Sequence, residues 1–553
     1  MSKTYNFQET LDKHSKNGNT KKSGTYLYVH QDQLNLQAFP ERLTREKPEL
    51  VLIESITDAS SLPFHKKKLI LEWSARRHFA LEAVESGFPV TYLQTDKTAA
   101  EALRGYLESN RNAVITCMQP AEYTPRKQLE ALNAEAGYRF EIIPNHFFIA
   151  DPSRWSGKVQ SGYRMEYFYR EMRRQTGYLM KGGKPVGGKW NFDDENRQPF
   201  PDRIETPSLT AFTPDEVTRD VIMEIEDRFP KHFGLSDGFA YAVTREQALE
   251  VLDDFIANRL SGFGPYQDAM AAGEPFLFHS LLSPYLNLGI LTAREVCEAA
   301  LEAYEAADES VKDKKASNND ALSTKNKLPL NSVEGFVRQI LGWREYIRIY
   351  YEAMMPEVRK SNFFLYDSPL PELYWSADTN MKCLRESVQS VREHGYAHHI
   401  QRLMVLSNFS NLTESDPYAL FKWFWLGFVD AHEWVVLPNV LGMSTFADGG
   451  VLASKPYIAG GNYIRKMSDY CSGCRFRVQD RTGKDACPFN YLYWSFIDRE
   501  QKHLNKNPRI GFMLKTWNKK SEKEKEEVRM MSGTFVESLK RYDQKNHASK
   551  KNS

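Results

Sequence analysis

The clearest guide to the fold is residues 50–93, LVLIESITDASSLPFHKKKLILEWSARRHFALEAVESGFPVTYL. Two short apolar runs, at 50–53 and 90–93, flank a stretch with helical character at 66–86. Strands buried on both faces of a sheet are continuously apolar, and a helix between two such strands makes them parallel neighbours. The segment therefore predicts a strand–helix–strand unit.

The same rhythm extends in both directions along the chain. Further apolar runs lie at 26–29, 113–117 and 140–143, and helical stretches at 97–109 and 124–136. We therefore predict that residues 24–150 form a Rossmann-like α/β domain, a parallel sheet with helices on both faces. No G-x-G-x-x-G motif follows the first run, so the dinucleotide-binding fingerprint is absent.

Length and composition narrow the class of protein further. A chain of 553 residues exceeds a single core of about 250–300 residues, so at least two domains are expected. The net charge of +1 means that any nucleic-acid partner needs a local basic patch. No apolar run approaches the roughly 20 residues of a membrane helix, and the polar start lacks a secretory signal. Six cysteines are too few for a disulfide scaffold, which indicates the cytoplasm.

Residues 151–240 are predicted to form a basic connector between two domains. Between 151 and 190 the chain has nine Lys or Arg against three Asp or Glu, a local charge of +6. Two interpretations are open. The stretch is either a solvated linker surface or an arm that contacts the phosphates of a nucleic acid.

Beyond the connector the pattern becomes helical. Apolar residues recur at a period of about 3.6 across 241–518, which predicts a large all-α domain. The polar residues 305–328 are expected to form a mobile surface loop. Residues 1–23 are expected to be a disordered extension, and 519–553 a charged helix with a polar tail.

Three cysteines in the helical part form the sharpest local motif. Cys471 and Cys474 are three positions apart, and Cys487 follows after twelve residues with a proline directly behind it. Two thiolates at this spacing can hold one metal centre, and Cys383 is the natural fourth ligand. Spacing alone leaves Zn²⁺, an iron–sulfur cluster and coincidence open, with the proline slightly favouring the cluster.

A series of short motifs, in this order, resembles the iron–sulfur bacterial cryptochromes and photolyases, that is, the prokaryotic (6-4) photolyases. The resemblance runs from about residue 25 to about 515 and includes all four cysteines named above. The motifs are HQDQL (30–34), HKKK (65–68), SARRHF (74–79), WNFD (190–193), HSLLSPY (279–285), GWREY (342–346), GYAHH (395–399), DAHEW (430–434), LPN (437–439) and GGNYI (460–464).

The resemblance implies three cofactors and a reaction. FAD is expected in the helical domain, a [4Fe–4S] cluster on the four cysteines, and a 6,7-dimethyl-8-ribityllumazine antenna in the α/β domain. The reaction is light-driven repair of (6-4) pyrimidine–pyrimidone photoproducts in DNA, with an electron from excited reduced FAD. UV-damaged DNA is the expected partner, and the protein is expected to be a monomer.

The resemblance also implies which residues contact the cofactors. The FAD diphosphate is expected at a turn before a helix, and the ring beside an ion pair. These candidates are His279, Ser280, Leu281, Leu282 and Ser283 at the turn, Trp343 and Arg344 on the flavin-side helix, the pair Arg402 and Asp430, and Asn439. Asp32 and Asp58 are the positions that match acids contacting the antenna.

The catalytic expectation centres on His399, the second residue of a His-His pair. The resemblance implies that this second histidine is the proton donor, a role that suits imidazole because its charge changes near neutral pH. His398 and Tyr457 are its expected network partners. Trp423 and Trp375 match positions proposed for flavin photoreduction, although core packing explains them equally well. The acidic run Asp193, Asp194 and Glu195 is a candidate site for a divalent cation such as Mg²⁺ near DNA phosphates, or a solvated acidic turn.

Two other functions fit parts of the sequence. A blue-light photoreceptor of the cryptochrome type would use the same cofactors without repair. A non-enzymatic nucleic-acid-binding module of the iron–sulfur primase type would share the cysteines, but it would not need the flavin motifs.

Overall fold

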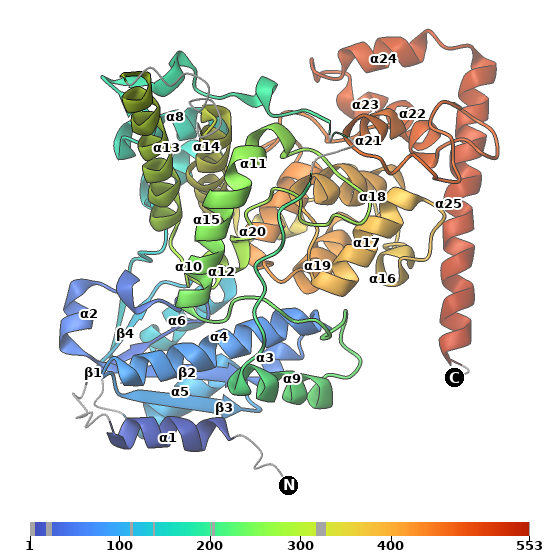
Figure 1. The fold of residues 1–553 in the computed structure, drawn as a ribbon. Helices are drawn as coiled ribbons and strands as arrows, with labels where there is room; N and C mark the ends of the chain where they lie inside the picture. Colours follow the sequence, from blue (N-terminus) through green and yellow to red (C-terminus); the bar gives the residue numbers. More distant parts are fainter. Residues whose placement is uncertain are drawn as a thin grey trace.

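The computed structural model describes residues 6–17, 25–110, 114–135, 139–199, 201, 205–316 and 328–551. Its N-terminal part contains a five-stranded, all-parallel sheet in the order β3-β2-β1-β4-β5 (Figure 1). The strands are β1 (Thr25–Tyr28), β2 (Glu49–Ser55), β3 (Val90–Thr95), β4 (Val114–Met118) and β5 (Arg139–Ile143). The predicted parallel sheet is therefore confirmed, with the first strand at its centre.

Helices cover both faces of this sheet because neighbouring strand residues point to opposite sides. Every residue of β2 is buried. Leu50 and Leu52 belong to the core that includes α4, whereas Val51 and Ile53 pack with Leu103 and its neighbours on α5 and α6. The helices of this part are α2 (Glu41–Glu46), α3 (Ile56–Ala59), α4 (Lys66–Glu85), α5 (Ala99–Ser109) and α6 (Tyr123–Ala134).

The expectation of disorder across residues 1–23 is wrong for the described part of that segment. Residues Phe7–Asn17 form helix α1, which packs against α4. Phe7 and Leu11, one turn apart, are buried, and the Phe7 ring meets Tyr92 edge-on with ring centroids 4.8 Å apart. Two apolar side chains on one face of α1 hold this otherwise polar segment in place, because both pack into the core that contains the apolar residues of α4.

The Phe7→Ala variant is expected to lose up to about 3–5 kcal/mol of unfolding free energy, the usual range for removing a buried phenylalanine. The loss is smaller if α1 undocks while the rest stays folded. Denaturant unfolding of the full chain measures it, with the exposed Lys13→Ala on the same helix as control. Equal stability of the two variants would show that α1 does not contribute to the core.

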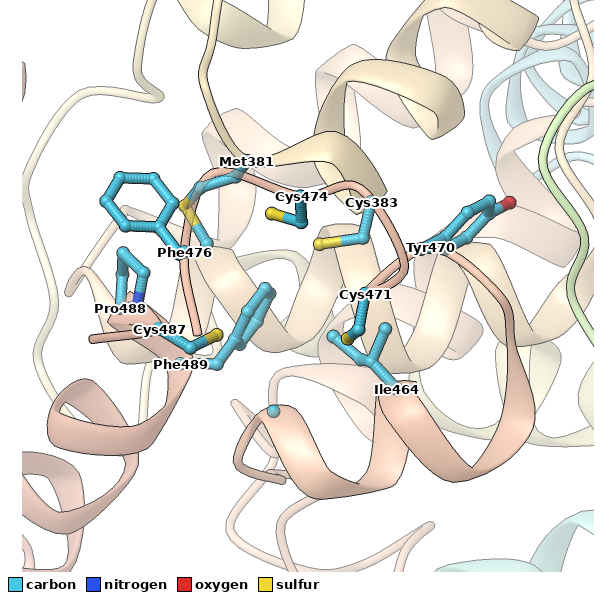
Figure 2. A pocket seen from close by; sticks show the side chains of 11 residues that line it. Met381, Cys383, Ile464, Tyr470, Cys471, Cys474, Phe476, Cys487, Pro488 and Phe489 are labelled. Atoms are coloured by element: carbon cyan, nitrogen blue, oxygen red, sulfur yellow. The ribbon is translucent and has the colours of Figure 1, made fainter. Parts of the chain in front are cut away.

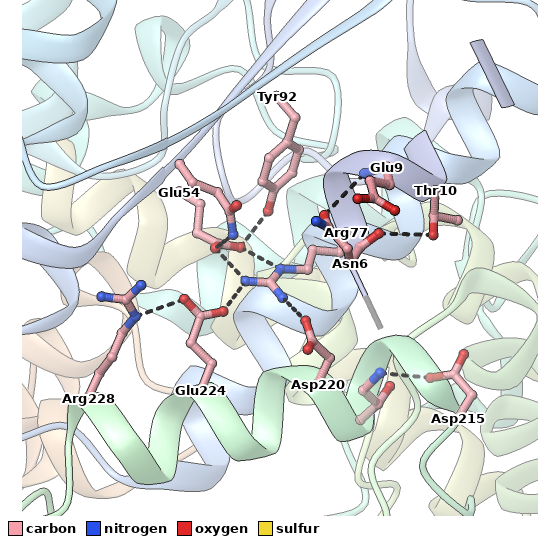
Figure 3. Close-up of polar contacts among 12 residues, drawn as sticks. Asn6, Glu9, Thr10, Glu54, Arg77, Tyr92, Asp215, Asp220, Glu224 and Arg228 are labelled. Carbon is pink, nitrogen blue, oxygen red and sulfur yellow. Dashed lines mark hydrogen bonds and ion pairs between the residues drawn. The ribbon is translucent and has the colours of Figure 1, made fainter. Parts of the chain in front are cut away.

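A buried ion network joins α4 and β2 to helix α9 (Glu216–Arg228). Arg77 of α4 extends toward Glu54 of β2 and toward Asp220 and Glu224 of α9 (Figure 3). Glu54 also accepts a hydrogen bond from the Tyr92 hydroxyl at 2.6 Å. The Arg77 side chain is only 1 % exposed, so these carboxylates are needed to compensate its buried positive charge.

Residues 151–240, the predicted connector, contain few helices and strands. A 3₁₀ turn, η4 (Asp193–Glu195), carries the acidic run. The other elements are α7 (Ser156–Gln160), α8 (Met165–Thr176), the hairpin strands β6 (Met180–Lys181) and β7 (Lys184–Pro185), and α9 (Glu216–Arg228).

The rest of the described chain is helical, and the predicted combination of an α/β part with an all-α part is confirmed. Four segments are π-helical, namely η5 (Phe255–Arg259), η6 (Arg338–Arg344), η8 (Gln401–Ser407) and η9 (Pro438–Ser444). The α-helices are α10 (Arg245–Asp254), α11 (Leu260–Tyr266), α12 (Ser283–Asn287), α13 (Ala293–Ala316), α14 (Leu330–Val337), α15 (Glu345–Met354), α16 (Leu373–Ser376), α17 (Lys382–His394), α18 (Asn408–Leu412), α19 (Pro417–Gly427), α20 (Glu433–Leu437), α21 (Gly461–Met467), α22 (Pro488–Arg499), α23 (Gln501–Leu504), α24 (Gly511–Asn518) and α25 (Glu522–Lys551).

Two further features concern the helical part. The prediction of a loop at 305–328 is wrong for 305–316, because α13 continues to Ala316. Residues 317–327 lie outside the described residues.

None of the helices in the described ranges combines the length and apolar character needed to cross a bilayer.

Candidate functional site

A cavity of about 930 Å³ opens within the helical part. This is near the upper end of the range of about 300–1,000 Å³ typical of ligand pockets. Its walls come from the connector helix α8, the turn at 279–283, and the segments η6, η8 and η9.

Three π-helical segments, η6, η8 and η9, supply four of the ten predicted flavin contacts. Trp343 and Arg344 lie on η6, Arg402 on η8 and Asn439 on η9, and all four line the cavity. A π-turn holds one residue more than an α-turn, which shifts the side chains that follow around the helix axis, and such turns are frequent at functional sites.

The cavity wall carries an excess of positive charge. Seven Arg or Lys side chains line it against four Asp or Glu. The cations are Arg170, Arg197, Arg338, Arg344, Arg402, Lys455 and Arg509, and the acids are Glu166, Asp193, Asp268 and Asp430. Such an excess favours an anionic ligand, for example a diphosphate or a nucleic-acid backbone.

The predicted ion pair between Arg402 and Asp430 is present and bidentate. Nη1 and Nη2 of Arg402 donate to the two oxygens of Asp430 at 3.1 and 3.0 Å. Ser283 donates its hydroxyl to the same carboxylate at 2.7 Å. The pair therefore holds a guanidinium in a fixed orientation at the cavity wall, although its role beside a flavin remains a prediction.

The turn before α12 has an unusual backbone. Leu281 has φ +56°, in the left-handed region that a branched side chain rarely adopts. Residues so held are typical of ligand-binding turns. His279, Ser280, Leu281 and Ser283 line the cavity, whereas Leu282 is buried in the core and does not.

Arg344 is a buried cation with an unsatisfied donor. Its Nη2 donates to the Leu286 carbonyl at 3.0 Å and its Nη1 lies 3.5 Å from Oε1 of Glu345, while Nε has no hydrogen-bond partner among the described residues. The guanidinium stacks on Phe148, 4.4 Å from the ring centroid, and burial lowers its pKa to about 10. A buried donor without a partner is costly, so this position suits a polar ligand.

The proposed catalytic residues meet at the same cavity. His399, His398 and Tyr457 all line it. The His399 side chain is 51 % exposed, and its Nε2 lies 3.3 Å from Oδ1 of Asp268. His398 is buried, and burial together with His279 lowers its pKa well below the usual value, so it is neutral at pH 7.

Phenylalanines lie along the predicted aromatic route to the cavity. Trp423 is fully buried, and its ring centroid lies 5.5 Å from Phe424, which lines the cavity. Trp375 is linked to Trp423 through Phe233, with centroid separations of 5.7 and 6.4 Å. Trp423 also donates its indole N–H to the Tyr374 carbonyl, as a core residue would.

The four predicted cysteine ligands converge at a second place (Figure 2). Cys383 lies on α17, Cys471 and Cys474 on the loop after α21, and Cys487 directly before α22. Their sulfur atoms border a small space closed by apolar side chains, namely Met381, Ile464, Phe476 and Phe489. Burial raises the pKa of Cys487 to about 12 and that of Cys471 to about 11, so a bound cation is needed to make them thiolates at neutral pH.

The four thiols can hold either a single metal ion or a cluster. One tetrahedral Zn²⁺ with bonds of about 2.3 Å needs all four sulfurs roughly 3.8 Å apart, whereas in an iron–sulfur cluster each thiolate binds a different iron. The ligand set, four cysteines around one space, suits both.

The two predicted antenna acids lie at the carboxyl ends of neighbouring strands but have different environments. Asp32 is buried and accepts hydrogen bonds from His30 at 2.7 Å and from the Ala121 amide at 2.8 Å. Burial by itself would raise the pKa of Asp32, but the neighbouring His30 outweighs this effect and the pKa is lowered. Asp58 is exposed and accepts from the Ala99 amide at the start of α5. Antenna binding by these residues remains a prediction.

Two of the three acidic side chains on η4 pair with neighbouring cations. Asp193 forms an ion pair with Arg338, and Glu195 lies 3.5 Å from Lys189. Of the three acids, only Asp193 lines the cavity. This pairing weakens the case for a divalent cation there, because a metal would have to displace Arg338.

Comparison with known proteins places this architecture in a family. Residues 27–241 match a family model described as deoxyribodipyrimidine photo-lyase-related protein. A (6-4) photolyase of Agrobacterium fabrum is 41 % identical over 505 residues, which span 90 % of this chain and 95 % of that protein. The chain belongs to the bacterial cryptochrome and photolyase family. The resemblance inferred from the short motifs is thereby confirmed.

Solved structures of photolyases and cryptochromes share the fold. A bacterial class III photolyase from Agrobacterium tumefaciens superposes with a TM-score of 0.51 at 16 % identity, covering 94 % of this chain and 99 % of that one. A cryptochrome from Synechocystis sp. PCC6803 superposes with a TM-score of 0.52 at 13 % identity, covering 80 % and 88 %. At these identities the likeness concerns the photolyase–cryptochrome fold alone.

The cavity fits the flavin that the photolyase fold implies. It is large, its wall is cationic, and buried donors such as Nε of Arg344 lack partners. Sequence reasoning missed Asp268 and Phe233, which contact His399 and the two tryptophans. No local signal marks either residue, because each meets its partner only through the tertiary fold.

Proposed function

We propose that this photolyase-family chain repairs (6-4) photoproducts in DNA in a light-driven reaction. The observation that carries the proposal is that His399 and the Arg402–Asp430 pair line one cationic cavity of flavin size. The relative that is 41 % identical bears the name (6-4) photolyase, which supports the same reaction.

Flavin binding is assigned to the residues around the cavity. The backbone of the turn at 279–283 and the hydroxyls of Ser280 and Ser283 would hold the diphosphate, and Trp343, Arg344, Arg402, Asp430 and Asn439 would surround the ring system. FAD held by these residues would supply, in its reduced and light-excited form, the electron for the lesion. The Arg402 guanidinium, fixed by Asp430, stabilises negative charge at its side of the cavity.

His399 is proposed to hold and deliver the proton to the lesion. Its half-exposed ring can reach a base that is turned into the cavity, whereas His398 is buried behind it. Asp268, whose Oδ1 lies 3.3 Å from Nε2 of His399, orients the ring. Tyr457 is the second group on the same wall, and burial raises its pKa, so it remains a neutral hydroxyl donor.

A [4Fe–4S] cluster on Cys383, Cys471, Cys474 and Cys487 is part of the proposal. The convergence of the four cysteines on one space lined by apolar side chains supports it, as does the family resemblance. The cysteines join three segments, so a bound cluster would hold α17, the loop at 471–487 and α22 together. A lumazine antenna near Asp32 is also proposed, supported by the family resemblance.

One experiment separates repair from light sensing. The purified protein is illuminated with an oligonucleotide that carries a single (6-4) lesion, and restored bases are quantified against a dark sample. Light-dependent restoration is expected. If flavin and cluster are bound and no restoration occurs, the photoreceptor function replaces the proposal.

DNA binding is expected to depend on the exposed cations of the connector. Arg173 is fully buried and donates to the carbonyls of Tyr178, Leu179 and Trp190, so it is structural. Lys181 and Lys184 on the small hairpin are exposed and free to meet phosphates. We expect the double variant Lys181→Gln, Lys184→Gln to reduce the slope of log K against log salt by about 2.

Fluorescence anisotropy with labelled damaged DNA over a series of salt concentrations measures this slope. Lys127→Gln on α6 removes an exposed cation outside the connector and serves as the control. An unchanged slope in the double variant would assign the hairpin to the solvated linker surface instead.

A further inference from the structure

Three imidazoles gather at one side of the cavity. Each of His279, His398 and His399 offers one ring nitrogen, and these three atoms all lie within 4.8 Å of one another. The rings of His279 and His398 are stacked with centroids 4.6 Å apart, and the His399 ring stands edge-on to His279 at 5.5 Å. The three residues come from two separate segments, the turn at 279–283 and the start of the η8 helix region.

Three ring nitrogens of the two inner histidines lack a hydrogen-bond partner among the described residues. His398 is only 2 % exposed, and neither of its ring nitrogens has a partner among the described residues. His279 is 7 % exposed, and its Nε2 is also without one. A neutral imidazole keeps one lone pair for a ligand, and a buried polar atom without a partner needs an explanation.

We propose that His279, His398 and His399 form a binding site for one Zn²⁺ ion, with the fourth coordination position open to the cavity. Three histidines with one open position are the ligand set of many zinc sites outside the purely structural class. This site is distinct from the four cysteines, which belong to other segments of the chain.

Small movements would complete the coordination. Zinc–nitrogen bonds of about 2.0–2.1 Å place tetrahedral ligand atoms roughly 3.4 Å apart, so the rings must close by about an ångström. His399 can supply that movement because its side chain is half exposed. Asp268, now 3.3 Å from Nε2 of His399, can then hold the nitrogen that does not bind the metal, as carboxylates commonly do for zinc-bound histidines.

Zinc at this site would act against repair, and this part of the inference rests on the proposed function. A zinc-bound imidazole has its lone pair in the metal bond, and it cannot take up the proton that His399 must deliver. Zn²⁺ is therefore expected to inhibit repair reversibly, and a chelator is expected to restore it.

The test measures zinc binding to the full chain with FAD and cluster loaded. Zn²⁺ is titrated in competition with a chromophoric chelator, and iron per chain is measured in the same samples to show that the cysteines stay occupied. We expect one zinc per chain. His398→Ala and, separately, the half-exposed His399→Ala are each expected to weaken binding by about tenfold or more, since even an outer-shell partner costs that much.

His146→Ala serves as the matched control, because His146 is exposed and lies outside the group of three histidines. The zinc affinity of this variant should equal that of the unaltered chain. No zinc bound in metal excess would overturn the proposal, and so would equal affinity in the two cluster variants. If zinc binds as expected but the metal-free protein repairs nothing, the proposed function fails while the zinc site stands.

Discussion

Replacement of His399 by alanine is expected to lower light-driven repair by about 100-fold or more, the usual contribution of a positioned general acid. His399 has a half-exposed imidazole on the wall of the cationic cavity, and its neighbour His398 is buried. No other imidazole on that wall is exposed enough to substitute for it among the described residues. Flavin content should remain, because the Arg402–Asp430 pair is untouched.

The measurement is the yield of restored bases per unit of light for a single-lesion oligonucleotide. Flavin absorbance and DNA affinity of the same sample show that the variant is folded and loaded. His146→Ala, which changes an exposed histidine elsewhere, should repair like the unaltered chain. Full repair by the His399→Ala variant would remove this residue from the mechanism.

Replacement of Cys474 by serine is expected to abolish cluster binding and to yield insoluble or iron-free protein. The four sulfurs border one space and come from three segments. Loss of one ligand therefore also removes a link between these segments. Iron per chain, with the visible absorbance of the purified protein, is the measurement. We expect iron to fall close to zero.

Cys297→Ala is the matched control, because Cys297 is also a buried cysteine but lies on α13 among core side chains. It should keep its iron even if it loses some stability. Normal iron content in the Cys474→Ser variant would show that Cys474 is not a ligand, and the assignment of the site would fail.

Prediction from the sequence succeeded where side chains of one kind follow each other closely. The apolar runs at 50–53 and 90–93 predicted buried parallel strands, and β2 and β3 are neighbours in the sheet. The order of the short motifs predicted the family, and the relative from Agrobacterium fabrum confirms it. In contrast, the polar composition of residues 1–23 concealed α1, because two buried side chains, Phe7 and Leu11, are too few to alter a compositional average.

The sequence by itself determined the sheet, the helical part and the family, since periodicity and local motifs are properties of neighbouring residues. Only the tertiary structure decided which side chains meet. The π-helical turns in η6, η8 and η9 look like ordinary helix in sequence, yet they aim Arg344, Arg402 and Asn439 at one cavity. Likewise, Asp268 and His399 lie 131 positions apart and meet at 3.3 Å because packing of the whole helical part brings them together.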